Sequence, residues 1–463
     1  MKMTQRPPVP TARDDLTGIE RSTMRLVNGR LVLILFAVYI FNYLDRTNIG
    51  IAKLHLQPDI GLSEAAYGLG AGLFFVGYVI FEVPSNIVLY KVGARLWIAR
   101  IMVTWGLVAM AMAFVQGEKS FYVLRFLLGV AEAGLVPGVI LYLTQWIPSI
   151  RRARVIGLFY LAVPLSSVFG APLSSWLMGF SPWGIDGWRF MFIIEGLPCL
   201  FLAVVVLKYL TDRPHQARWL TTEQRGWLTR ELDKEEESLS GHSHRVGSFA
   251  GALRDPRVLG MSVVYFSMII PIYALAFFLP AIVKQMGSFS TLQIGFITAI
   301  PYVFASIGLL VLARRSDRLG ERVYHYAVPA AVGAAGLVLA AVTLSSSPVL
   351  ALVGFSLGAI GCISTLPCFW SETPKLLTGV AAAAGIALIS SIGNIAGFVA
   401  PYMVALIKGE EQSDAGSTNA VLVCAGFLAV AAVVMVVVGR SITAAKARSA
   451  AQQEFPAPEE SRT

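Results

Sequence analysis

Residues 31–52 read LVLILFAVYIFNYLDRTNIGIA, an apolar run that carries one charged pair, Asp45 and Arg46. A run of about 20 apolar residues is long enough to cross a bilayer as a helix. Only 14% of the 463 residues are charged, whereas soluble domains have about 25%. Similar runs follow near 67–90, 97–116, 119–145, 154–178, 188–210, 258–284, 291–313, 325–346, 348–370, 380–407 and 419–440. The sequence therefore predicts an all-α membrane protein with twelve transmembrane helices.

The basic residues of the short connections predict the orientation of these helices. Lys and Arg are enriched in cytoplasmic loops. One side of the predicted protein collects seventeen of them, and the other side has five, namely Lys53, Lys119, Arg189, Lys284 and Lys408. Both termini are therefore expected to be cytoplasmic. The net charge of +9 follows largely from this asymmetry, so it does not indicate nucleic-acid binding.

A polar stretch divides the twelve runs into two sets of six. We expect a disordered cytoplasmic arm at 1–30, a six-helix bundle at 31–210, a cytoplasmic loop at 211–257, a second bundle at 258–440 and a cytoplasmic tail at 441–463. A basic loop recurs as YKVGARLW (90–97) and SDRLGERV (316–323), and its glycines, Gly93 and Gly320, lie 227 positions apart (320 − 93). Parallel repeats of this kind place a binding site between two rocking bundles.

Ionisable residues at membrane depth are costly and indicate function. Asp45 and Arg125 are predicted to lie at a similar depth, each about 10 Å from the same surface at a rise of 1.5 Å per residue. Arg125 and Glu132 are two helical turns apart, on one face of their helix. We therefore expect Asp45, Arg125 and Glu132 to form one proton-coupling network, in which Arg125 moves between the two carboxylates. The alternative is a permanent ion pair that holds two helices together.

Arg46 lies about 100° around its helix from Asp45, so it is expected to face the central cavity. An unpaired guanidinium there suits an anionic ligand. The alternative is that Arg46 pairs with Glu82 or with a backbone carbonyl. Glu82 is assigned a capping role near the cytoplasmic end of its span. Glu195 and Glu372 fit structural roles and are left out of the site.

The recurring loop resembles the signature of the major facilitator superfamily. The second copy keeps Asp317, Arg318, Gly320 and Arg322, whereas the first copy has Asn86 and Tyr90 where the pattern has glycine and aspartate. The resemblance implies that these loops hold spans together while a transporter changes conformation. The loop residues expected to act as gates are Gly93, Arg95, Asp317, Arg318, Gly320 and Arg322.

Five further motifs are similar to those of the anion:cation symporter family within that superfamily. They are NYLDRTNIGIA (42–52), GYVIFEVPSN (77–86), RFLLGVAEAGLVPG (125–138), QWIPSIRRARVIG (145–157) and SSIGNIAGFVAPY (390–402). The resemblance implies that Asp45 and Glu132 respond to protons and that Arg125 is their partner. It also implies that Arg46 holds the carboxylate of the substrate. Further positions implied to contact substrate are Tyr43, Tyr78, Trp370 and Asn394.

The fifth span has Val163 and Pro164 where sugar-acid members of that family tend to carry an amide. This difference favours a tartrate-like or aromatic acid, with a hexonate or hexuronate as the alternative. We expect a monomeric proton symporter that imports a small organic anion across the bacterial inner membrane. An anion antiporter and a non-transporting receptor are weaker alternatives. A sugar-phosphate antiporter is disfavoured because span 258–284 has no internal charge, and basic drugs would be repelled by Arg46. No motif indicates an enzyme, a cofactor or a metal site.

Overall fold

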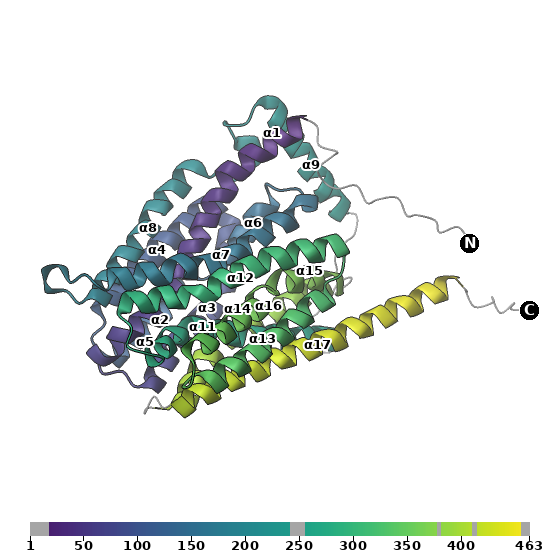
Figure 1. The fold of residues 1–463 in the computed structure, drawn as a ribbon. Helices are drawn as coiled ribbons and strands as arrows, with labels where there is room; N and C mark the ends of the chain where they lie inside the picture. The colour runs from purple at the N-terminus through teal and green to yellow at the C-terminus, as the bar shows by residue number, and fades with distance from the viewer. Residues whose placement is uncertain (1–17, 241–254, 377–380, 410–413, 455–463) are drawn as a thin grey trace, which may run out of the picture.

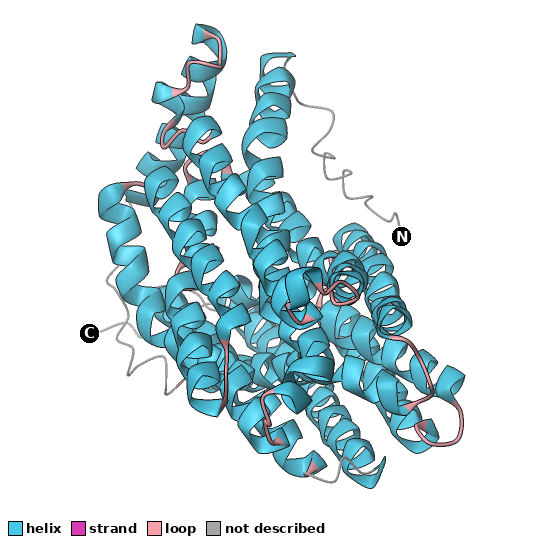
Figure 2. Ribbon diagram, turned by 90° about the vertical axis from the view of Figure 1, so that its left-hand side faces the viewer, coloured by secondary structure: helices cyan, strands magenta, loops and turns pink. Residues whose placement is uncertain are grey.

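The computed structural model describes residues 18–240, 255–376, 381–409 and 414–454, and within them the chain consists of helices and connecting loops (Figure 2). A π-helical turn, Asn28–Val32, joins the first two helices. The helices are α1 (Gly18–Val27), α2 (Leu33–Asp59), α3 (Glu64–Val92), α4 (Ala94–Ala111), α5 (Glu118–Glu132), α6 (Leu135–Thr144), α7 (Ser149–Leu177), α8 (Gly187–Tyr209), α9 (Thr222–Ser240), α11 (Pro256–Gln285), α12 (Thr291–Leu319), α13 (Val323–Thr343), α14 (Pro348–Ile363), α15 (Leu366–Leu376), α16 (Ala381–Lys408) and α17 (Asp414–Glu454).

Across the described ranges, twelve helical segments are long and apolar enough to cross a membrane, from Gly18–Asp59 to Ala415–Ser441. Each of them coincides with one of the twelve predicted runs, so the predicted fold class is confirmed. The physical reason is simple, because a helix needs about 20 apolar residues to span the hydrocarbon layer and the sequence marks each such run separately.

Two of these segments are broken, although the sequence predicted continuous runs. The fourth span consists of α5 and α6, separated at Ala133 and Gly134, and the tenth consists of α14 and α15, separated at Ser364 and Thr365. Gly134 has a φ of 86°, which favours glycine, and a Cβ there would lie 2.5 Å from the Ser85 hydroxyl oxygen. The breaks lie 231 positions apart (364 − 133), which supports the internal repeat.

The first helix corrects the expectation of a disordered arm, because residues 18–27 form α1. Thr23, Met24 and Val27 are buried. The Gln224 amide of α9 donates a hydrogen bond to the Ser22 hydroxyl over 3.1 Å. α1 and α9 therefore lie together at one end of the molecule, at the top of Figure 1, and the C-terminal end of α17 extends to the right. Residues 1–17 and 455–463 of the predicted arm and tail lie outside the described residues.

Helices α2–α8 and α11–α17 form two halves that meet along α3 and α16, α7 and α12, and α2 and α11. Glycines bring the halves together: a Cβ on Gly50 would lie 2.3 Å from the Ala276 backbone oxygen, and one on Gly68 would lie 2.4 Å from the Ala405 Cβ. These contacts use the C-terminal part of α2 and the N-terminal part of α3. The halves are thus closed at the end opposite α1.

A buried ion pair stabilises that closed end. Lys53 Nζ lies 2.6 Å from Glu64 Oε2, and both side chains are almost fully buried. The ammonium also lies 4.5 Å from the ring centres of Tyr67, in the first half, and Phe278, in the second. Because Phe278 belongs to α11, this cation contributes to the contact between the halves.

Candidate functional site

Arg46 of α2 lies where the two halves meet. Its NH2 group forms an ion pair with Oε1 of Glu132, the last residue of α5. Its NH1 group donates a hydrogen bond of 3.2 Å to the hydroxyl of Tyr273, which belongs to α11 in the other half. Arg46 is only 7% exposed and Glu132 is fully buried. One guanidinium thus links a carboxylate of the first half to a hydroxyl of the second half.

Aromatic rings surround this guanidinium. Its central carbon lies 5.0 Å from the ring centre of Phe74, 5.2 Å from Tyr78, 5.8 Å from Tyr43 and 5.9 Å from Phe75. Such contacts favour a cation held away from water. The sequence singled out Tyr43 and Tyr78, and the structure places both beside Arg46. Phe74 and Phe75 were missed because nothing in the sequence distinguishes them from ordinary packing residues.

The Arg46–Glu132 pair has unused hydrogen-bonding groups. Within the described part of the chain, Arg46 Nε and Glu132 Oε2 are buried without a hydrogen-bond partner. A guanidinium can hold a carboxylate with two parallel N–H donors, so Arg46 has capacity beyond its two present partners. This cluster can therefore accept a second anionic group at the interface between the halves.

Arg125 differs from its predicted role. It is buried, donates a hydrogen bond of 3.3 Å to the Ala71 backbone oxygen and lies 5.2 Å from the Phe74 ring centre. Among the described residues, Arg125 forms no ion pair with a carboxylate. The predicted network of Asp45, Arg125 and Glu132 is therefore wrong in its contacts, because Glu132 pairs with Arg46. The ion pair between Arg46 and Glu132 also differs from the prediction that Arg46 is unpaired and from the alternative that it pairs with Glu82.

Asp45 turns away from α5 and toward α8. Its Oδ2 accepts a hydrogen bond from the Cys199 thiol, with 3.3 Å between sulfur and oxygen, and its Oδ1 lies 3.5 Å from the Asn48 amide nitrogen. Adjacent residues of a helix point about 100° apart, so with Arg46 facing α5 the side chain of Asp45 must face a different neighbour. That neighbour carries Glu195, for which the sequence predicted a structural role outside the site.

The other two predicted substrate contacts lie in the second half. Trp370 of α15 packs edge-on against Tyr265, with 5.1 Å between ring centres. Asn394 of α16 donates a hydrogen bond of 3.2 Å to Oε2 of Glu82 in α3. Glu82 lies ten residues before the end of α3 and bonds across the halves, so its predicted capping role is wrong.

The first of the two predicted gating loops is completed by a distant residue. Gly93 has a φ of 99°, and the backbone N–H of Arg95 donates a hydrogen bond of 2.9 Å to Asp212, just after α8. Asp212 thus supplies a carboxylate to a loop that has Tyr90 where the family pattern has aspartate. The sequence could not indicate this residue, since it lies 119 positions after Gly93 (212 − 93).

The second loop is held by its own residues. Asp317 pairs with Arg322 over 2.5 Å, Gly320 ends α12 with a φ of 64°, and Arg318 is exposed. Burial opposes ionisation of Glu321, but its hydrogen bonds from the backbone of Tyr324 and from His325 lower the pKa of this carboxyl below its ordinary value. The connection from α12 to α13 is therefore stabilised by ionised groups.

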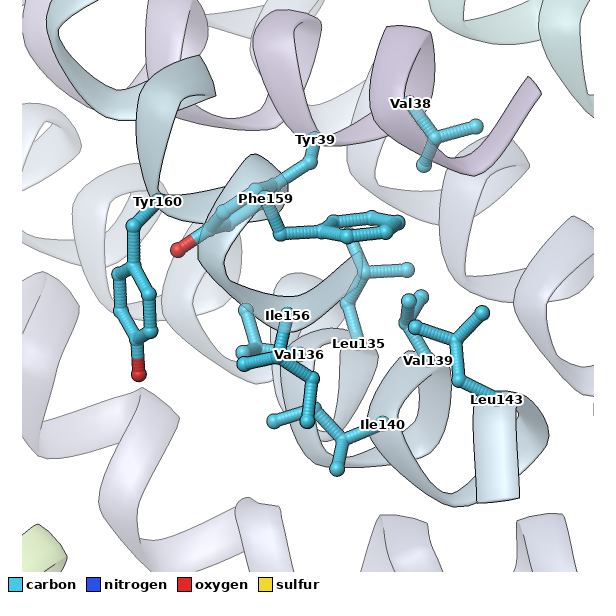
Figure 3. A pocket seen from close by; sticks show the side chains of 10 residues that line it. All are labelled: Val38, Tyr39, Leu135, Val136, Val139, Ile140, Leu143, Ile156, Phe159 and Tyr160. Carbon is cyan, nitrogen blue, oxygen red and sulfur yellow. The ribbon is translucent and has the colours of Figure 1, made fainter. Parts of the chain in front are cut away.

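A separate apolar cavity lies within the first half, between α2, α6 and α7 (Figure 3). Ten side chains line it, and only the hydroxyls of Tyr39 and Tyr160 are polar among them. Without a cationic side chain in its lining, this cavity suits an apolar group and not a carboxylate. The Arg46 cluster remains the candidate site for an anion.

An all-helical membrane protein whose two halves meet around a buried arginine has the architecture of an alternating-access transporter. A family model described as Major Facilitator Superfamily matches residues 35–401, and the chain belongs to that superfamily. It is a multi-pass membrane transporter and not an enzyme.

Relatives along nearly the whole chain agree with this. The chain is 46% identical over 424 residues to the "Putative tartrate transporter" of Agrobacterium vitis, covering 91% of this chain and 92% of that protein. It is 44% identical over 390 residues to the "Quinolone resistance transporter" of Acinetobacter baumannii, covering 84% and 89%. A solved inward-facing bacterial homolog of the human lysosomal transporter Spinster matches with a TM-score of 0.72 at 16% identity, covering 90% and 98% of the two chains. That likeness shows the fold alone.

Proposed function

We propose that this protein is a proton-coupled symporter that imports a small organic carboxylate across the inner membrane of a bacterium. The observation that carries the proposal is the ion pair between Arg46 and Glu132, formed beside Tyr273 where the two halves meet. The name of the Agrobacterium vitis relative, which specifies tartrate, and the carboxylate preference of a guanidinium support the same substrate class.

The charge balance of this cluster supports the proposed coupling. With Glu132 ionised, the pair is neutral and Arg46 is occupied. A substrate carboxylate that binds Arg46 adds a second negative charge in a buried place, where like charges disfavour each other. A proton on Glu132 restores neutrality and frees the guanidinium for the substrate. Substrate and proton therefore bind together more readily than either binds alone.

The closed end defines the conformational state within this proposal. If the termini are cytoplasmic, as the basic loops predict, the end closed by Gly50, Gly68 and the Lys53–Glu64 pair faces outward. Import requires this end to open for loading and to close again before release. The hydrogen bond from Arg46 to Tyr273 joins the halves near the site, so filling the site and moving the halves are physically connected.

Transport by purified protein in liposomes tests the proposal. The panel contains tartrate, an aromatic acid, a hexonate and a quinolone, and tartrate or the aromatic acid is expected to accumulate when the outside is acidic. A protonophore should abolish this accumulation. Accumulation that ignores the pH gradient would exclude proton coupling, and selective transport of the hexonate would support the alternative substrate class.

Glu132→Gln tests the role of the carboxylate directly. Glutamine cannot release a proton, so the variant should exchange labelled for unlabelled substrate but should not accumulate it. Glu118→Gln is the matched control, since Glu118 is exposed at the start of the same helix. If Glu132 only held helices together, exchange and accumulation would fall in parallel with thermal stability.

A further inference from the structure

A pair of buried carboxylates, Asp45 and Glu195, lies in the first half and has contacts separate from those of the Arg46–Glu132 ion pair. Glu195 of α8 is 2% exposed and accepts hydrogen bonds from the Ser174 hydroxyl, over 2.6 Å, and from the Asn48 amide, over 2.8 Å. The same Asn48 nitrogen lies 3.5 Å from Oδ1 of Asp45, which is also 2% exposed. One amide group thus lies between two buried carboxylates from α2 and α8.

These two carboxylates have no cationic partner in the described part of the chain, since neither of them forms an ion pair there. Two negative charges close together in a low-dielectric interior are strongly disfavoured, and carboxylate pairs of this kind share a proton. The neighbouring Arg46 already forms an ion pair with Glu132, so its guanidinium is not an ion-pair partner of Asp45 or Glu195. Asp45 and Glu195 are therefore suited to hold one proton as a pair, on one carboxyl group or the other.

The groups facing this pair are few. Asp45 comes from α2, and Cys199 comes from α8 itself and donates to Asp45. α7 contributes the Ser174 hydroxyl, and α4 contributes the Trp105 indole beside Asp45. Glu132 of α5 is the next charged group beyond Asp45. Among the residues that the structure describes, the surroundings can donate hydrogen bonds to these carboxylates but form no ion pair with them that would replace a proton.

A cavity between the two halves reaches the two residues that donate hydrogen bonds to Glu195. It is lined by Asn48 and Ser174, the two residues that bond Glu195, and by Thr298 and Tyr302 of α12. The hydroxyl of Thr298, which is 3% exposed, and Oδ1 of Asn48 have no hydrogen-bond partner among the described residues. The cavity has room for a water molecule, and these polar atoms could bind one.

We propose that Asp45 and Glu195 form one proton-binding site, joined through Asn48 and loaded by water in the cavity between α2, α7, α11 and α12. The inference rests on the proposed symport and adds Glu195 as a second carrier and a proton route separate from the substrate site. In each loading step, one carboxyl O–H bond forms as one O–H bond of a hydronium ion breaks, which leaves a water molecule. Because both halves line the cavity, its access changes when the halves move.

Glu195→Gln tests the pair with two measurements. Accumulation driven by a pH gradient should be lost while labelled exchange persists, and Glu118→Gln should behave as the parent protein. Infrared titration of the purified protein in lipid, without substrate, should show a protonated carboxylic-acid band in the parent that is lost or altered in both Glu195→Gln and Asp45→Asn. A band that Glu195→Gln leaves unchanged, together with intact accumulation, would overturn the proposal.

A second variant tests the proton route without altering the bonds of Glu195. Thr298→Val keeps the shape of the side chain but removes its hydroxyl from the cavity. Slower pH-driven uptake with unchanged exchange supports the route, and uptake at the parental rate overturns it. Failure of the proposed symport would give a different result, because the parent protein itself would then not accumulate any carboxylate under a pH gradient.

Discussion

Gly50 lies at a close contact between α2 and α11, so it offers a way to change the equilibrium between closed and open states. A Cβ at this position would lie 2.3 Å from the backbone oxygen of Ala276 and 3.1 Å from the Cα of Phe277. The first distance falls 1.1 Å short of the 3.4 Å at which ordinary contact begins. Because both atoms are backbone, no side-chain rotation relieves the overlap. Gly50→Ala should therefore hold the halves apart at this end.

The size of the effect follows from the cost of overpacking, which is about 1–3 kcal/mol. The clashing atoms belong to the other half, so the cost falls on the closed arrangement and not on the folding of either half. A bias of about 1–3 kcal/mol changes the ratio of two states about 5- to 150-fold. Transport needs both states, so net uptake should fall by a comparable factor.

Cross-linking at the closed end measures this shift. His55 and Thr291 come from different halves, and their Nε2 and Oγ1 atoms lie 3.0 Å apart. The double variant His55→Cys and Thr291→Cys, treated with a short bifunctional thiol reagent, should cross-link efficiently in the parent and poorly with Gly50→Ala. The four native cysteines are buried and should not compete.

The matched control is Gly426→Ala in α17, because a Cβ there would meet nothing within 4 Å. This variant should cross-link and transport as the parent does. Circular dichroism and gel filtration should show that Gly50→Ala stays folded. Equal cross-linking in Gly50→Ala and its parent would refute the view that this glycine contact sets the closed state.

Three further outcomes are expected. Arg46→Ala should abolish carboxylate binding in a folded protein, and Arg46→Lys should restore it only partly, because an ammonium lacks the planar fork of a guanidinium; binding to purified protein measures both. Lys53→Met should lower the free energy of unfolding by about 3–5 kcal/mol because it removes the ammonium that lies 2.6 Å from the buried Glu64 carboxylate, and the double variant with Glu64→Gln should recover part of that loss. The pKa of Glu321 is lowered, so its ionised carboxylate stabilises the α12–α13 connection at neutral pH. This stabilisation should be lost as the pH falls below 4.5 and through the lowered pKa. Amide exchange at Tyr324, followed against pH with Glu321→Gln as reference, measures the loss.

The sequence predicts the membrane fold well because hydropathy reports the number and length of the spans directly. It did not reveal the breaks in the fourth and tenth spans. Gly134 lies in an apolar run, where a helix interior and a helix end look alike in composition. Only the positive φ of Gly134 and its approach to Ser85 show that the chain turns there.

The candidate site shows a different limit of sequence reasoning. Position along a span predicts the depth of a charge, but the rotation of each helix about its axis decides which neighbour it meets. Arg46 and Glu132 were both identified as functional, yet the sequence paired Glu132 with Arg125 and left Arg46 unpaired. A rotation of about 100° separates one arrangement from the other, and only packing between helices determines that angle.

The two buried acidic sites, Glu132 and the Asp45–Glu195 pair, differ in what controls their protonation. Glu132 shares its charge with Arg46, so a ligand that competes for this arginine changes the state of Glu132 directly. Asp45 and Glu195 have hydrogen-bond donors around them but no cationic partner in the described residues, so their protonation depends on access to water and on each other. In the proposed mechanism, the first site would respond to substrate, and the second would respond to whether the cavity between the halves is accessible. A protein that needs both signals before it moves would avoid leaking protons without substrate.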